Sequence, residues 1–348
     1  MRNHLYNSDM KKIVIDVLGG DHAPNAILDG VVAAGKIDSN LQFLLVGDES
    51  IITNQMTKAK MISRCEVVHS VDCISNDEAP TVVKSRTESS IAMGINALKT
   101  REDCGAFVSA GSTGAVLAAS VLMLGRIPGV SRPALCPGMP TYIKGQKAYV
   151  LDVGANMDCR PEMLLHFAIM GSEYCKLVAG KESPRVGLIN VGTEDKKGNE
   201  LSLAAHKLLK ECPAINFTGN AEARDVFSGD FDVLVCDGFV GNVLLKSCEG
   251  SFMLLGSKLK SAFTSGIISS LAALCLRGKV KTVKREVGHE TVGGACFLGT
   301  KKPVIKAHGS SSPEAVKNAI LLAAQSIDGN LSENIETAIK GATAEQSA

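Results

Sequence analysis

Short, β-branched apolar runs that stop at a glycine-containing polar loop recur along this chain, and several lead into helical periodicity. The clearest runs are residues 12–18, 41–46, 65–69, 106–108, 148–153, 186–191 and 233–236. Such runs are typical of buried parallel strands, and their alternation with helices is typical of α/β proteins. We therefore expect an α/β fold with a doubly wound, mostly parallel sheet and helices on both faces.

In such a sheet, ligands bind beyond the carboxyl ends of the strands. At least five strand ends here deliver glycine together with Asn, Asp, Thr or Ser to that edge, which favours a polar pocket over a set of unrelated turns. The candidate residues in these loops are Gly20, Asp21, His22, Asn156, Thr193, Asn220, Asp237, Gly238, Gly241 and Asn242. For Asp21 and His22, a helix-capping role explains the pattern equally well.

The stretch 109–115 reads Ser-Ala-Gly-Ser-Thr-Gly-Ala and lies between an apolar run and a helical run at 116–124. Gly111 and Gly114 allow the backbone to approach a ligand closely, and Ser112 and Thr113 can donate hydroxyl hydrogen bonds. The start of a helix also favours a negative group. The spacing matches neither the dinucleotide fingerprint nor the Walker loop. The loop is therefore either a phosphate site or a structural turn.

Length allows one large α/β domain or two smaller ones, and the residue pattern indicates neither a metal site nor a cofactor. The chain has 348 residues and a formal net charge of +1, which indicates no general attraction to nucleic acid. Its 11 cysteines contain no CxxC pair, and the histidines lack zinc spacing. Residues 1–12 lack the apolar core of a signal peptide. We expect a cytoplasmic protein with reduced thiols.

We see no internal repeat and no linker, so we expect one α/β domain over 11–330. From 313 the chain is expected to be helical to about 340 and then to fray, so that 331–348 forms a partly disordered C-terminal tail. We also expect a helix over 80–99 that carries Lys84, and an antiparallel hairpin formed by 293–298 and 304–307.

An apolar helical arm is expected at about 251–285. Its uncharged run, 261–276, has 16 residues, which is short for a bilayer span. An apolar helical pair with a basic flank is typical of membrane-surface elements, although a buried dimer helix is the alternative. The residues expected to bind a membrane are Phe263, Ile267, Ile268, Leu271, Arg277, Lys279 and Lys281.

Several of these motifs, taken together and in order, resemble the PlsX family of phosphate acyltransferases. The stretches that carry the resemblance are 14–16, 19–24, 109–115, 151–156, 236–242 and 306–309. Two positions depart from the family pattern: Ser112 stands where asparagine is usual, and Lys84 stands where arginine is frequent.

The resemblance implies a fold similar to phosphotransacetylases and isopropylmalate dehydrogenases, and a homodimer. It also implies that inorganic phosphate and long-chain acyl-acyl carrier protein are converted into acyl-phosphate for phospholipid synthesis. The partners would be acyl carrier protein, a downstream glycerol-3-phosphate acyltransferase and the inner face of the cell membrane. The basic cluster of the arm could bind either the membrane or the acidic carrier protein. A phosphotransacylase that uses a coenzyme A thioester is the alternative.

The chemistry of this reaction decides which residue types matter. Phosphate is already an anion, and a thiol with a pKa near 8.5 leaves without much acid assistance. The site should therefore supply anion binding, orientation and oxyanion donors. No Gly-x-Ser-x-Gly elbow is present, which favours direct phosphorolysis without an acyl-enzyme. The expected catalytic residues are Asn156, Asn220, Asn242, Lys306 and His308, and Lys84, Gly111, Ser112, Thr113 and Gly114 join the strand-end loop residues in binding phosphate.

Overall fold

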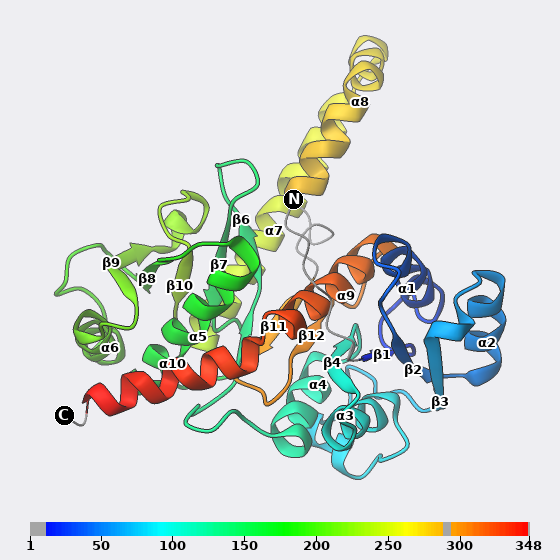
Figure 1. Cartoon of the computed structure of the whole chain (residues 1–348). Coiled ribbons are helices and arrows are strands. Elements are labelled where there is room, and N and C mark those ends of the chain that lie inside the picture. Colours follow the sequence, from blue (N-terminus) through cyan, green and yellow to red (C-terminus); the bar gives the residue numbers. More distant parts are fainter. Residues whose placement is uncertain (1–11, 288–293, 347–348) are drawn as a thin grey trace.

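The computed structural model describes residues 12–287 and 294–346. In this part of the chain two sheets are flanked by helices (Figure 1). One sheet has seven strands in the order β3-β2-β1-β4-β12-β11-β5, and the other has five in the order β6-β7-β10-β8-β9. The predicted doubly wound, mostly parallel α/β architecture is confirmed. The strands are, however, divided between two sheets.

The seven-stranded sheet is parallel from β3 to β12, and β11 runs antiparallel to both of its neighbours. Its strands are β1 (Lys12–Asp16), β2 (Phe43–Gly47), β3 (Cys65–His69), β4 (Cys104–Ser109), β5 (Ala134–Cys136), β11 (Ala295–Leu298) and β12 (Val304–Lys306). Strands β2 and β4 are buried along their whole length, which accounts for their continuous apolar sequences. The predicted C-terminal hairpin is present as β11 and β12; its first position, 293, lies outside the described residues.

The five-stranded sheet is parallel except for β6 at its edge. Its strands are β6 (Gly138–Pro140), β7 (Lys147–Leu151), β8 (Arg185–Asn190), β9 (Asn216–Glu222) and β10 (Val233–Val235). Strands β5 and β6 are separated by one residue, so the chain passes directly from one sheet to the other.

Helices cover both sheets. Those of the body are α1 (Asn25–Ile37), α2 (Glu49–Lys58), α3 (Ser90–Thr100), α4 (Thr113–Ala119), α5 (Pro161–Ala179), α6 (Glu200–Glu211), α9 (Pro313–Asp328) and α10 (Leu331–Gln346). Helices α1 and α9 cross closely because Gly30 has no side chain: a Cβ there would lie 2.6 Å from Val316 Cβ. In α5, Phe167 and Met170 are fully buried.

The helix predicted over 80–99 is wrong in its first half. The chain forms a short 3₁₀ turn at Pro80–Lys84, and α3 starts only at Ser90. Between them, Arg86 pairs with Asp72 and Glu78. The Ser89 hydroxyl accepts a hydrogen bond from Ala92 N–H and so caps a new helix.

The helical segment expected from 313 to about 340 is present as α9 and α10. The expected fraying beyond 340 is wrong up to Gln346, where α10 ends; this helix packs against α5. Leu331, Ile335 and Ile339 recur at helical spacing and are at most 2% exposed. Residues 347–348 lie outside the described part.

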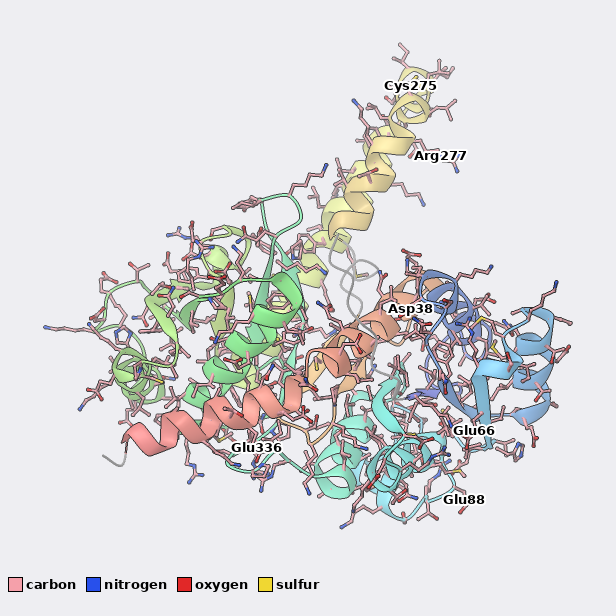
Figure 2. All side chains as sticks on the ribbon, viewed as in Figure 1. Asp38, Glu66, Glu88, Cys275, Arg277 and Glu336 are labelled. Carbon is pink, nitrogen blue, oxygen red and sulfur yellow. The ribbon has the colours of Figure 1, made fainter. Side chains whose placement is uncertain are left out.

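A helical hairpin projects from the body (Figure 1). It is formed by α7 (Gly238–Phe263) and α8 (Ile267–Val287). Helix α7 begins within the body, 13 residues before position 251, the expected start of the arm. Ile267 and Ile268 are more than 80% exposed, and Figure 2 shows Arg277 on the projecting part. In the described residues, no helix is long and apolar enough to cross a membrane. Lys281 lies in α8, and its side chain is outside the described part.

Candidate active site

A cavity of about 520 Å³ lies where the two sheets meet, beside the first turns of α7. Its wall includes loops that follow β4, β7 and β12. Six of the residues singled out in the sequence line it: Asp21, Gly111, Thr113, Asn242, Lys306 and His308. Ligand cavities commonly occupy such volumes and such places in α/β proteins.

The strand order brings the 109–115 loop next to the loop after β12. Strand β12 is parallel to β4, with Lys306 opposite Ser109. The Ala307 N–H donates a 2.9 Å hydrogen bond to Ser109 O. Both strands therefore end at the same edge, and the residues after them enter one cavity.

A buried carboxylate supports the 109–115 loop. Ser109 Oγ donates to Asp16 Oδ2 at 2.6 Å and accepts from Gly111 N–H at 3.0 Å. Asp16 is 1% exposed; burial raises the pKa of its carboxyl group, and the bond from Ser109 acts in the opposite direction. A side chain at Gly19 would overlap both Asp16 and the Gly111 backbone. The sequence motif contained Asp16, yet nothing local distinguished it from a residue at the end of a strand.

The four loop residues expected to bind phosphate have different surroundings. Gly111 and Thr113 line the cavity, and the Thr113 side chain is exposed to it. Ser112 is buried and caps α4 by accepting from Ala115 N–H at 3.5 Å. Gly114 faces Pro80, and a Cβ there would lie 2.7 Å from Pro80 Cγ. Ser112 and Gly114 thus have structural contacts of their own.

Lys306 brings a buried positive charge to the cavity. Its side chain is 7% exposed, and its Nζ donates to the carbonyl oxygen of Ala307. Burial lowers the pKa of this amine to about 8, while the negative charges of Asp16 and Asp21 act to raise it. The amine is therefore mostly charged at neutral pH, and it can lose its proton under mildly alkaline conditions.

The contacts of His308 define its neutral tautomer. Its Nδ1 accepts a hydrogen bond from Ser310 N–H at 3.2 Å and lies 2.9 Å from Ser310 Oγ. A ring nitrogen that accepts from an amide carries no proton, so the proton of the neutral ring is on Nε2. His308 is exposed and can donate from this atom.

Asp152 ties the two sheets together at the cavity, and it was not among the predicted site residues. Its fully buried carboxylate accepts from Leu135 N–H at 2.9 Å and Ala155 N–H at 3.2 Å, and from the backbone and side-chain nitrogens of Asn156 at 2.6 and 2.9 Å. Burial raises its pKa, and these bonds oppose the shift. The Asn156 amide also donates to Pro133 O at 2.8 Å, so its contacts position the cavity wall.

The first residues of α7 hold this helix against the loop after β7. Asp237 caps α7, with its Oδ1 accepting from Val240 N–H at 2.8 Å. Side chains at Gly238 or Gly241 would collide with the backbone of Asn156 or Asp152. These residues place Asn242 at the cavity. Its side chain lies beside Gly154, where an added Cβ would be 3.6 Å from Asn242 Oδ1.

The remaining candidates lie outside the cavity lining. Asn220 is buried in the five-stranded sheet, 3.0 Å from His206 Nδ1, and it donates to Glu194 O at 2.8 Å. Thr193, Lys84 and His22 are exposed. Gly20 has a φ of +102°, and a Cβ there would lie 2.9 Å from Gly309 O, so it allows two loops to pack closely.

The remaining lining is mostly apolar, and it also contains the ion pair of Lys246 and Glu249. Its apolar residues are Leu135, Pro137, Met139, Pro140, Val153, Met157, Leu245, Cys248 and Phe252. An anion and an apolar chain could thus occupy opposite ends of one cavity. Within residues 12–287 and 294–346, no cluster of His, Cys, Asp and Glu side chains is arranged to hold a metal ion.

Two solved structures have a similar fold over most of this chain. A phosphotransacetylase from Streptococcus pyogenes matches 92% of this chain and 95% of its own, with a TM-score of 0.59 and 16% identity. A branched-chain phosphotransacylase from Enterococcus faecalis V583 matches 91% and 99%, with a TM-score of 0.57 and 15% identity. At these identities the likeness concerns the fold alone, and it confirms the expected phosphotransacetylase-like architecture.

Sequence relatives are much closer. A protein named phosphate acyltransferase from Brevibacillus brevis is 44% identical over 94% of this chain and 97% of its own length. A protein of the same name from Bacillus subtilis is 43% identical over 94% of this chain and 98% of its own length. The profile of the family described as "Fatty acid synthesis protein" matches residues 11–334. The transferase class expected from the motifs is confirmed. The chain belongs to this fatty acid synthesis protein family, as its similarity to the phosphate acyltransferases also shows.

Proposed function

We propose that this protein transfers a long acyl group from acyl-acyl carrier protein to inorganic phosphate and releases acyl-phosphate for phospholipid synthesis. The observation that carries the proposal is the two-ended cavity, with Thr113, Lys306 and His308 at one end and an apolar lining at the other. The names of the sequence relatives support both the acyl group and the phosphate.

Phosphate would bind between the 109–115 loop and Lys306. The Thr113 hydroxyl and the loop N–H groups supply donors, and the Lys306 amine supplies charge. The Asp16–Ser109–Gly111 hydrogen bonds hold the loop in place before phosphate arrives. Such preorganisation lowers the cost of ordering the site during the reaction.

The acyl transfer needs no enzyme nucleophile. A phosphate oxygen attacks the thioester carbonyl carbon, and a tetrahedral oxyanion forms. The carbonyl then reforms, the carbon–sulfur bond breaks, and the electron pair leaves with the thiolate. The Nε2–H of His308 and the amide of Asn242 are two cavity groups that would donate to the oxyanion or to sulfur.

The projecting hairpin would bind the inner face of the cell membrane. Ile267, Ile268 and Leu271 are 60% or more exposed, and Phe263 is partly exposed at the end of α7. Arg277 and Lys279 follow on α8 and are exposed, and Lys281 continues the basic run in sequence. Apolar burial and basic charge together favour an anionic lipid surface.

The remaining partners follow from the same proposal. Peripheral binding would bring the enzyme close to a membrane-bound glycerol-3-phosphate acyltransferase that consumes the acyl-phosphate. We expect a cytoplasmic homodimer.

The test is to incubate the purified protein with palmitoyl-acyl carrier protein and phosphate and to detect acyl-phosphate by mass spectrometry. A parallel reaction with palmitoyl-coenzyme A distinguishes the two thioester carriers, and a chelator tests for a metal requirement. We expect product from the carrier-protein thioester, unaffected by chelator. Absence of product, or strong preference for coenzyme A, would contradict the proposal.

A further inference from the structure

The apolar half of the cavity runs along one face of α7. Asn242, Leu245, Cys248 and Phe252 line the cavity at spacings of three and four residues, which places them on one side of the helix. Lys246 and Glu249 line the cavity as well, and they neutralise each other in an ion pair with Lys246 Nζ 2.7 Å from Glu249 Oε2. Ten residues of α helix correspond to about 15 Å. The cavity therefore has a polar end at Asn242 and a distal end about 15 Å away at Phe252.

The opposite wall comes from the link between the two sheets. Leu135 and Pro137 line the cavity before β6, and Met139 and Pro140 line it within β6. Leu245 and Cys248 pack partly against the core that also contains Leu135 and Met139. This wall is fixed by Asp152, which holds Leu135 N–H at 2.9 Å. We call the mainly apolar part of the cavity between these two walls the lane.

Three aromatic rings meet at the distal end. The Phe252 ring centroid lies 5.7 Å from that of Phe227, which lies 6.5 Å from that of Tyr142. The Tyr142 N–H donates to Phe227 O at 2.8 Å, so the hairpin between β6 and β7 is fastened to this cluster. Tilted contacts at such distances are favourable for aromatic pairs.

Beyond Phe252 the helix leaves the body. Met253, Leu254 and Leu255 are 58–76% exposed, and none of them lines the cavity. Phe252 is therefore the last residue of α7 on the cavity wall. Beyond it, α7 continues into the projecting hairpin (Figure 1).

We propose that Phe252, supported by Phe227, closes the acyl subsite and sets the longest chain that the enzyme accepts. The inference rests on the proposed function, since it assigns the apolar lane to the acyl group. An acyl chain whose thioester lies at the polar end would extend along α7 and meet the Phe252 ring. Removing the ring should open the lane toward the hairpin, and adding bulk earlier should shorten it.

The experiment compares lauroyl, myristoyl, palmitoyl and stearoyl thioesters of acyl carrier protein, each in competition with palmitoyl, in detergent-free solution. Phe252→Ala should raise the ratio of kcat/KM for stearoyl over myristoyl roughly tenfold, the lower range for a methylene in an apolar pocket. Cys248→Phe, one turn nearer the polar end, should lower it by a similar factor. Met253→Ala is the matched control, since Met253 is 76% exposed and faces away from the cavity.

The outcomes separate this inference from the proposed function. If the wild type makes acyl-phosphate but Phe252→Ala and Met253→Ala give the same length profile, the inference is wrong. If Phe252→Ala does not fold, Phe252→Leu and Cys248→Phe decide the matter through shifts in opposite directions. If the wild type makes no acyl-phosphate from any thioester, the proposed function itself fails.

Discussion

Ser109 Oγ lies 2.6 Å from the buried carboxylate of Asp16 and accepts a 3.0 Å hydrogen bond from the N–H of Gly111. One hydroxyl therefore joins β1, β4 and the 109–115 loop. The two strands are adjacent and parallel, which fixes this contact by register. The hydroxyl serves as donor and acceptor at once, and alanine can replace neither role.

Ser109→Ala should lower the free energy of unfolding by about 1–3 kcal/mol and raise the KM for phosphate. The stability loss follows because a buried carboxylate and an amide lose their partner. The KM should rise because Gly111 N–H is no longer oriented. Urea unfolding and steady-state kinetics measure the two effects. If stability falls while the KM for phosphate is unchanged, the Asp16–Ser109–Gly111 hydrogen bonds have a structural role only.

Thr113→Val should raise the KM for phosphate roughly tenfold, the value of one hydrogen bond to a charged group, with no change in melting temperature. Valine keeps the shape of threonine and removes only the hydroxyl. Gly114→Val provides the contrast: its side chain would press on Pro80, so it should lower the melting temperature. Equal phosphate KM values for wild type and Thr113→Val would place the anion elsewhere.

The phosphate affinity should fall as pH rises through about 8, because burial lowers the pKa of Lys306 to that value and the amine then loses its charge. Lys306→Arg should remove this alkaline loss, since arginine stays charged. Lys306→Met should reduce kcat/KM about 100-fold at neutral pH. A pH profile of kcat/KM for the three proteins is the measurement. An identical alkaline limb in the arginine variant would assign the titration to another group.

Whereas phosphate affinity should fall as pH rises, the lowered pKa of Lys306 should make the folded protein more stable as pH rises. Below about pH 8 the folded protein carries a buried charge that the unfolded chain exposes, which destabilises the fold. This cost should diminish as pH rises from about 8 toward the ordinary lysine value of 10.5. Comparing urea midpoints of wild type and Lys306→Met across this range isolates the effect, and parallel curves would contradict it.

Asn242→Ala and Asn220→Ala should separate activity from stability. Asn242 lines the cavity and is exposed, so its loss should reduce kcat while leaving the melting temperature unchanged. Asn220 is 5% exposed and bonds His206 and Glu194, so its loss should lower the free energy of unfolding by about 1–3 kcal/mol and leave kcat unchanged. A large kcat loss for a stable Asn220→Ala would return this residue to the catalytic set.

Replacing Ile267, Ile268 and Leu271 together with serine should release the protein from anionic liposomes and leave turnover in solution unchanged. The three side chains are 60–84% exposed, so their loss removes lipid contacts and little packing. Arg277→Glu with Lys279→Glu should weaken binding mainly at low salt. Vesicle sedimentation and light scattering measure binding and oligomeric state. Dissociation of a dimer, with liposome binding retained, would identify the hairpin as a subunit interface.

The α/β class and the glycine loops after the strands could be read from the sequence, because they depend on residues close together in the chain. Period-two and apolar runs identify strands, and glycine next to small polar residues marks their ends. The same local patterns gave the hairpin of β11 and β12 correctly. They failed at 80–99, where Ser89 caps a second helix inside one apparently continuous pattern.

Which loops share the cavity was decided only by the tertiary structure. Asn220 and Asn242 both belong to glycine-containing polar stretches, yet one is buried in β9 and the other faces the cavity. Lys306 acquires its shifted pKa because β12 inserts beside β4, although the two strands are far apart in the chain. The order of strands in a sheet depends on packing between distant segments. Local periodicity carries no information about it, and so the sequence determined the kinds of residues at the site while the fold determined which of them meet.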